Sequence, residues 1–148
     1  MLAALNAFYP GAEWKDTDGK PIQAHGGSVI VADGKYYFYG ENKEKTDGVN
    51  GLWHWGMRIY SSTDLYNWKD EGLFIAPDEQ APKNAMRNPK SFSDRPHILF
   101  NEKTKKFVCW LKIMSREDYL LQTETVLTAD QILGPYTKVR EGLRPLGM

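Results

Sequence analysis

The chain has 148 residues, 41% of them hydrophobic and 13% aromatic, which is long enough for one domain with a packed core. Its 19 basic residues balance its 19 acidic ones, so the composition excludes the charge footprint of a protein that binds nucleic acid or an anionic membrane surface. No apolar stretch approaches a membrane span, and the one cysteine, Cys109, has no second cysteine for a disulfide or a metal pair. The many Trp and Tyr residues are typical of a β-rich protein and suit a ligand with a flat ring face.

After an irregular lead-in over residues 1–21, the strongest local pattern is a hairpin within residues 22–41. Two runs rich in β-branched and aromatic residues flank Asp33-Gly34, a pair that readily adopts the positive φ angles of a type I′ turn. The two strands are then antiparallel, so His25 at the start of the first meets Glu41 at the end of the second. If that end opens into a pocket, an imidazole and a carboxylate converge there.

Two further strands follow in the first half of the chain. Residues 57–62 alternate large and polar side chains, and residues 69–75 form a second apolar run after a turn. Residues 22–75 therefore predict a meander of four antiparallel strands. Residues 76–93 contain three prolines and are predicted to be a linker.

The same pattern returns in residues 94–142. Tyr36-Tyr37-Phe38-Tyr39 aligns with Phe107-Val108-Cys109-Trp110, and Asp64 aligns with Asp130. Strands are predicted at residues 95–100, 107–112, 119–128 and 137–140. A repeat of about seventy residues with four strands per copy has the size of a propeller blade, so the predicted fold class is all-β, with two blades.

One segment of the second copy has two interpretations. Ser115-Arg116-Glu117-Asp118 resembles a capping box before a helix, and residues 122–133 contain good helix formers. Thr123, Thr125 and Val126 instead favour a strand and match the third strand of the first copy. We favour the strand.

Several motifs together resemble the family-43 glycoside hydrolases, and most of all the branch that contains the exo-β-1,3-galactanases. The motifs are Pro10-Gly11, the stretch from Trp14 to Gly27 that ends in Gln-Ala-His-Gly-Gly, Tyr37-Phe38-Tyr39-Gly40-Glu41, the stretch from Tyr60 to Trp68, and Asp94-Arg95-Pro96-His97. The Ser-x-Asp-Leu-x-x-Trp element is shared with other sugar-processing propellers. The stretch before Gly27, combined with Tyr-Gly-Glu, is more specific.

The resemblance implies a five-bladed β-propeller that hydrolyses glycosidic bonds with inversion, using a general acid and a general base separated by a water. Most of the family carry the base on the first blade, near Ala24-His25-Gly26. This chain has no Asp there, and the galactanase branch departs from the family in the same way. That branch carries an acidic residue before Arg-Pro in the second blade, usually Glu. Here it is Asp94.

Five blades need roughly 300 residues, whereas 148 residues make two. Residues 143–148 resemble the segment that precedes the third blade, so we expect the chain to be the N-terminal portion of a longer enzyme whose general acid comes from a later blade. We also expect the 148-residue chain to be inactive alone, because a pocket from two blades lacks an opposing carboxylate.

The candidate catalytic residues are Asp94 and Glu41, and the candidate substrate contacts are His25, Arg95, Trp53, Trp55 and Arg58. Each has a plainer interpretation. His25 could bond a backbone carbonyl, Glu41 could pair with Arg58 or Arg95, and Asp94-Arg95 could be a surface ion pair. Trp53 and Trp55 could stack on a sugar ring or could seal the gap between blades.

The predicted function is hydrolysis of O-glycosyl bonds in a plant-type polysaccharide or its oligosaccharides, either galactan or a polymer bearing arabinose or xylose. The alternative is a carbohydrate-binding propeller without catalysis. No cofactor and no metal are predicted, and neither nucleic acid nor membrane is an expected partner. Self-association through exposed blade edges is a third expectation. The N-terminus shows no signal peptide, and a secreted or periplasmic location is favoured over the cytoplasm.

Overall fold

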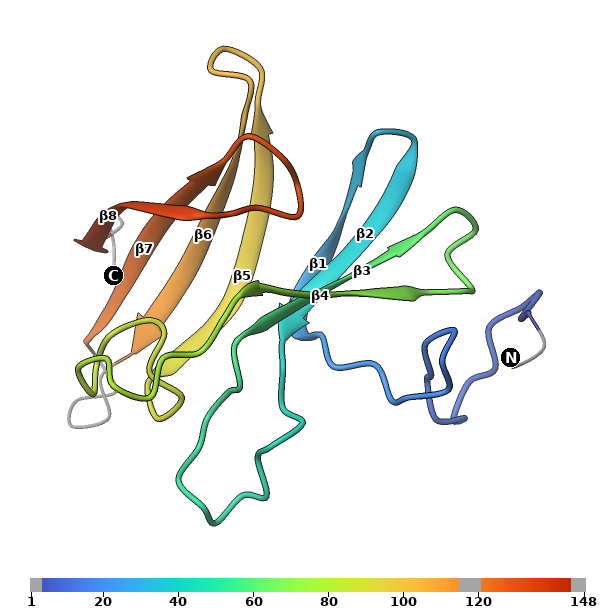
Figure 1. Cartoon of the computed structure of the whole chain (residues 1–148), viewed down its shortest axis with the longest axis horizontal. Helices are drawn as coiled ribbons and strands as arrows, with labels where there is room; N and C mark the ends of the chain where they lie inside the picture. Colours follow the sequence, from blue (N-terminus) through green and yellow to red (C-terminus); the bar gives the residue numbers. More distant parts are fainter. Residues whose placement is uncertain (1–3, 115–120, 145–148) are drawn as a thin grey trace.

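A computed structural model describes residues 4–114 and 121–144. These residues form two four-stranded antiparallel sheets, each in the order of the chain (Figure 1). The first sheet consists of β1 (His25–Ala32), β2 (Lys35–Glu41), β3 (Met57–Ser62) and β4 (Lys69–Ile75). The second consists of β5 (Phe92–Asn101), β6 (Lys106–Met114), β7 (Gln122–Ala129) and β8 (Thr137–Leu143). The prediction of an all-β fold built from two four-stranded meanders is confirmed.

The β1–β2 hairpin forms as its turn sequence dictates. Asp33 and Gly34 have φ angles of 49° and 71°, the two positive values that a type I′ turn needs. The register then places His25 opposite Glu41 at the far end, as the sequence predicted. Strands β3 and β4 begin and end at the predicted residues.

The segment with two interpretations is a strand where the structure describes it. β7 pairs with β6 along its length, from Phe107 opposite Ala129 to Met114 opposite Gln122, and β8 covers its other edge. The predicted strand over residues 119–128 is therefore confirmed from Gln122 onward, while residues 119–120 and the Ser115–Asp118 motif lie outside the described part of the chain.

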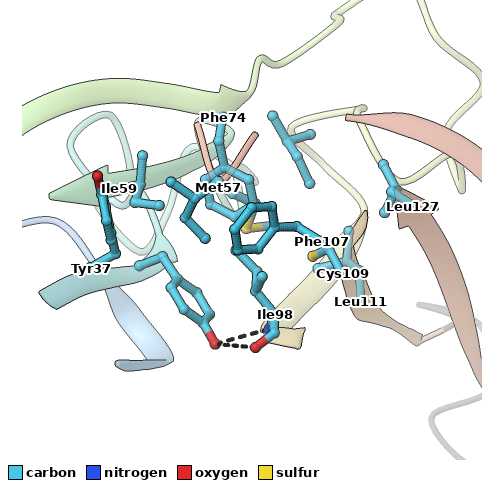
Figure 2. Close-up of a cluster of buried hydrophobic side chains, with 12 residues drawn as sticks. Tyr37, Met57, Ile59, Phe74, Ile98, Phe107, Cys109, Leu111 and Leu127 are labelled. Carbon is cyan, nitrogen blue, oxygen red and sulfur yellow. Dashed lines mark hydrogen bonds between the residues drawn. The ribbon is translucent and has the colours of Figure 1, made fainter. Parts of the chain in front are cut away.

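The main hydrophobic core lies between the two sheets (Figure 2). Alternate residues of β2 and β3, such as Tyr39 and Ile59, pack against alternate residues of β5 and β6, such as Ile98 and Cys109. The Tyr39 hydroxyl accepts a hydrogen bond from the Ile98 amide at 2.9 Å and donates to the Ile98 carbonyl at 3.4 Å. One phenol thus satisfies both backbone groups of a residue in the other sheet, which fixes β2 against β5.

The Ser-x-Asp-Leu-x-x-Trp element is the turn between β3 and β4. One oxygen of Asp64 accepts the amides of Tyr66 and Asn67, each at 2.8 Å, and the other accepts the Asn67 side-chain amide. These hydrogen bonds lower the pKa of Asp64 to about 2, and the two from Asn67 have the largest effect. The indole of Trp68 donates to the Leu65 carbonyl and is buried, so the element closes a turn.

Candidate functional site

The innermost strand of each sheet carries a β-bulge at the same place. In β1 the bulge lies between the pairs His25–Glu41 and Ser28–Tyr39, and in β5 it lies between Asp94–Lys112 and His97–Trp110. The two strands lie side by side, and both bulges occur near the strand starts (Figure 1). Bulges re-aim side chains and are over-represented next to active sites.

The backbone repeats as well as the register. Gly26 and Arg95 occupy the same position in their bulges and have φ angles of 58° and 52°. This conformation is free for glycine but costs a residue such as Arg95 about 1 kcal/mol. His25 and Asp94 therefore occupy equivalent places, as do Glu41 and Lys112. The acidic residue of the pair therefore lies on β2 in the first sheet and on β5 in the second.

Glu41 connects the two sheets at this end. Its side chain is buried, Oε1 accepts a hydrogen bond from the Arg95 amide at 3.2 Å, and Oε2 lies 2.7 Å from Lys43 Nζ. A Cβ added at Gly26 would lie 2.8 Å from Glu41 Oε1, so the carboxylate occupies the space that the glycine leaves. The predicted pairing of Glu41 with Arg95 occurs through the Arg95 backbone.

Asp94 is the second buried carboxylate, one residue from the amide that Glu41 holds. Lys112 Nζ lies 3.0 Å from its Oδ1, but that atom accepts no aligned hydrogen bond from the described residues. Glu124 follows Lys112 across the sheet, which makes a row of acid, base and acid. Burial raises the pKa of Glu124, the Lys112 charge opposes this shift, and Asp94 adds to it. Asp94 is therefore no surface residue.

The two predicted substrate contacts beside these carboxylates are exposed. His25 Nε2 lies 3.2 Å from Gln23 Oε1, and the same oxygen accepts the Lys43 amide at 3.1 Å. Arg95 uses its backbone amide on Glu41, and its Cγ would lie 3.7 Å from a Cβ at Gly26. The Arg95 side chain therefore borders the space that the Glu41 carboxylate occupies and presents its guanidinium to solvent, whereas the His25 ring donates from Nε2 to Gln23.

Arg58 lies apart from the buried carboxylates in its pairing. Arg58 is on β3, opposite Gly40 of β2, and its guanidinium binds Asp70 at 2.5 Å and Glu44 at 3.0 Å. The predicted alternative, an ion pair between Glu41 and Arg58, is not formed, because Lys43 holds the carboxylate instead.

Trp53 and Trp55 lie in the loop between β2 and β3. Trp53 contacts Phe92 with ring centroids 4.6 Å apart, and Lys43 Nζ lies 4.0 Å from its ring centroid. Its buried Nε1 donates to no described residue. Trp55 carries Lys45 Nζ 3.7 Å from its centroid. Each indole therefore has a cation over one face, and Trp53 also packs against the start of the second sheet.

His54, between these tryptophans, was not singled out from the sequence. It is fully buried, and its Nδ1 accepts the Gly56 amide at 2.9 Å. Burial, followed by the charge of Lys43, lowers its pKa to about 4. The ring is therefore neutral at pH 7 and holds the loop in place.

Within the described residues, no group of three or more His, Cys, Asp or Glu side chains is placed to hold a metal ion. No helix in that part of the chain is long and apolar enough to cross a membrane. The arrangement offers two buried carboxylates as hydrogen-bond acceptors, bordered by the exposed Arg95 guanidinium as a donor and by the His25 ring. Neutral ligands with many hydroxyl groups match this set.

Neither a protein-family model nor a curated protein matches the chain, but solved structures do. A family-43 β-1,3-galactosidase, solved with galactodeoxynojirimycin, is 38% identical over 88% of this chain and 37% of its own length, with a TM-score of 0.74. An exo-β-1,3-galactanase from Phanerochaete chrysosporium, solved with galactose, is 31% identical over 93% of this chain and 30% of its own, with a TM-score of 0.77.

An exo-β-1,3-galactanase from Clostridium thermocellum is 29% identical over 92% of this chain and 27% of its own, with a TM-score of 0.75. The chain thus spans between 27% and 37% of the length of these three solved chains. Its two sheets match consecutive parts of theirs at a level of identity that carries the family as well as the fold. The chain belongs to glycoside hydrolase family 43, in the branch that contains the exo-β-1,3-galactanases, and its two sheets are blades of a β-propeller.

Proposed function

We propose that this chain forms part of the sugar pocket of an enzyme that hydrolyses O-glycosyl bonds in galactan or a related plant-type polysaccharide. The observation that carries the proposal is the meeting of two buried carboxylates at one peptide. Glu41 accepts the Arg95 amide, and Asp94 precedes it. Buried carboxylates are costly unless they are paired, and such groups concentrate at functional sites.

In this proposal Glu41 accepts a hydrogen bond from a sugar hydroxyl, and Asp94 holds or moves a proton beside it. Asp94 Oδ1 suits this role because it is buried and has acceptor capacity left. His25 and Arg95 donate to further hydroxyls. Inversion also needs an acid and a base on opposite sides of the sugar, and these come from residues outside the chain.

The remaining predicted contacts complete the pocket from the β2–β3 loop and β3. Trp55 has one ring face covered by Lys45, so a pyranose would stack on the other. Trp53 would offer its buried Nε1, which donates to no described residue. Arg58, held by Asp70 and Glu44, would contribute at the pocket margin.

The first test is sugar binding by the 148-residue chain, measured by NMR titration with galactose. We expect millimolar binding that shifts the amides of His25 and Arg95. Glu41→Gln and Asp94→Asn should each weaken it about tenfold, because a hydrogen bond to a charged group is lost. Glu102→Gln is the matched control, since Glu102 is exposed and pairs only with Lys105.

Each outcome of this titration bears on the proposal. If neither galactose, arabinose nor xylose binds, the proposed sugar pocket is wrong. If binding is unaffected by both site variants, the sugar binds elsewhere on the chain. Hydrolysis of β-1,3-galactotriose by the chain alone would contradict the proposal that the acid and base lie outside it.

A carbohydrate-binding module without catalysis is the second candidate. Such a module would account for the absence of an Asp from Ala24-His25-Gly26, where the resemblance places the base of most family members, although the galactanase branch shares that absence. Under this function, a chain extended to the length of its solved relatives would bind galactan but release no galactose. Release of galactose would exclude it.

We also propose that copies of the chain associate through the outer face of the second sheet. Leu99 is 49% exposed and Trp110 38% exposed, and the register puts Val108 and Val126 beside them. An apolar sheet face of this kind is unusual on a monomer. Light scattering should give a dimer or larger species at micromolar concentration, and Trp110→Glu should return a monomer. Val49→Glu, in an exposed loop, is the control. A wild-type monomer at all concentrations would contradict this.

A further inference from the structure

Lys43 contacts three segments of the chain next to Glu41. Its ammonium group is 2.7 Å from Glu41 Oε2, donates to the Trp53 carbonyl, and lies 4.0 Å from the centroid of the Trp53 ring. Its backbone amide donates to Gln23 Oε1, which also contacts His25. The end of β2, the segment before β1 and the β2–β3 loop are therefore joined through one lysine.

The contacts divide the two oxygens of Glu41 between different tasks. Oε2 contacts the ammonium, whereas Oε1 accepts a hydrogen bond only from the Arg95 amide, at 3.2 Å, within the described residues. A carboxylate oxygen has two lone-pair sites, so Oε1 can accept one more hydrogen bond. Without Lys43, nothing would hold Oε2, and the plane of the carboxylate could turn away from the Arg95 amide.

We propose that Lys43 is a positioning residue for sugar binding, which orients the Glu41 carboxylate so that Oε1 faces the ligand and ties the Trp53 loop to the same group. This inference rests on the proposed function. It extends that function by assigning a role to a residue that does not touch the sugar and that lies outside the motifs from which the pocket was inferred.

Burial distinguishes this pair from an ordinary surface ion pair. The side chains of Lys43 and Glu41 are 22% and 7% exposed, whereas those of Lys105 and Glu102 are 72% and 79% exposed. A screened surface pair contributes little, but removing one partner of a buried pair leaves the other charge uncompensated. Lys43 therefore acts on Glu41 far more strongly than a surface lysine could.

Lys45 provides a matched control in the same loop. It also lies over a tryptophan, with Nζ 3.7 Å from the Trp55 ring centroid, but it forms no ion pair with a carboxylate of the described residues. Lys43→Met and Lys45→Met both keep an unbranched stem and remove one charge and one cation–π contact. Only the first removes the contact with Glu41.

The experiment combines amide hydrogen exchange with galactose titration on the full chain. In Lys43→Met, exchange of the Arg95 amide should accelerate about tenfold and galactose affinity should fall about tenfold, because Glu41 no longer points at either donor. Lys45→Met should leave the exchange of the Arg95 amide unchanged. Lys43→Arg, which keeps a cation, should recover part of both.

A double-mutant cycle separates positioning from general destabilisation. In a Glu41→Gln background, Lys43→Met should have little further effect on galactose affinity, since the group it orients is gone. The double variant removes both buried charges and leaves neither uncompensated. It should therefore fold, and can be measured, even if Lys43→Met alone unfolds.

Unchanged Arg95 exchange in folded Lys43→Met, or equal losses of affinity in the presence and absence of Glu41, would overturn the inference. The proposed function can fail separately: if the wild-type chain binds no sugar, the sugar pocket is wrong, and the Arg95 exchange still decides whether Lys43 orients Glu41.

Discussion

Gly27→Ala is expected to prevent the first sheet from closing, with a loss of more than about 4 kcal/mol in the free energy of unfolding. A Cβ at this position would lie 1.5 Å from the Tyr39 carbonyl oxygen and 2.8 Å from the Gly40 Cα. Both neighbours are backbone atoms of β2, so no side chain can move aside. The β1 bulge would have to open, which would displace Glu41 and the start of β1 with it.

Thermal unfolding followed by circular dichroism, together with amide exchange across β1 and β2, measures this effect. Gly34→Ala is the control, because Gly34 lies in the adjoining turn with a positive φ, 71°, and an added Cβ there would have no atom within 4 Å. It should cost only about 1 kcal/mol of backbone strain. A Gly27→Ala protein that melts within a few degrees of Gly34→Ala would show that the bulge is not closely packed.

Acidification from pH 7 to pH 4 is expected to remove on the order of 3 kcal/mol of stability through His54 alone. Burial lowers the pKa of this imidazole from 6.5 to about 4 in the folded chain. The unfolded state therefore binds the proton first. The contribution is fully present above pH 6.5 and is lost as the pH falls toward 4.

Urea unfolding at a series of pH values tests this, with His54→Gln as the variant. The variant should be less stable than the wild type at pH 7, because it replaces a buried ring that accepts the Gly56 amide. Between pH 6.5 and 4 its stability should decline less steeply. Parallel slopes for wild type and His54→Gln would contradict the expectation.

Local chemistry explains why much of the fold was predictable. Asp33-Gly34 encodes its own turn, and the alternation of large and polar residues in Met57–Ser62 places Met57 and Ile59 in the core between the sheets. The second sheet was less predictable at its ends. β5 begins at Phe92, three residues before the predicted start, because Phe92 and Ser93 pair with Met114 and Ile113 across the sheet. That pairing is long-range and leaves no local pattern.

The candidate site was predicted in part. Glu41 was named because the hairpin register brings it opposite His25, and Asp94 because the resemblance places an acidic residue before Arg-Pro. Both are buried where the two inner strands meet. The partners of these carboxylates were not predicted. Lys112 could have been found by aligning the repeats, since it takes the place of Glu41 opposite the second bulge.

The sequence by itself determined the strands, the turns, the repeat and the acidic residues, because these depend on side-chain alternation and on residues that encode backbone angles. Tertiary structure alone decided which cation holds each carboxylate. Lys43, rather than Arg58 or the Arg95 side chain, pairs with Glu41, and this depends on how the β2–β3 loop packs against the second sheet. The strength of a charge pair depends on the distance between the charges and on their burial, and neither can be read from the sequence alone.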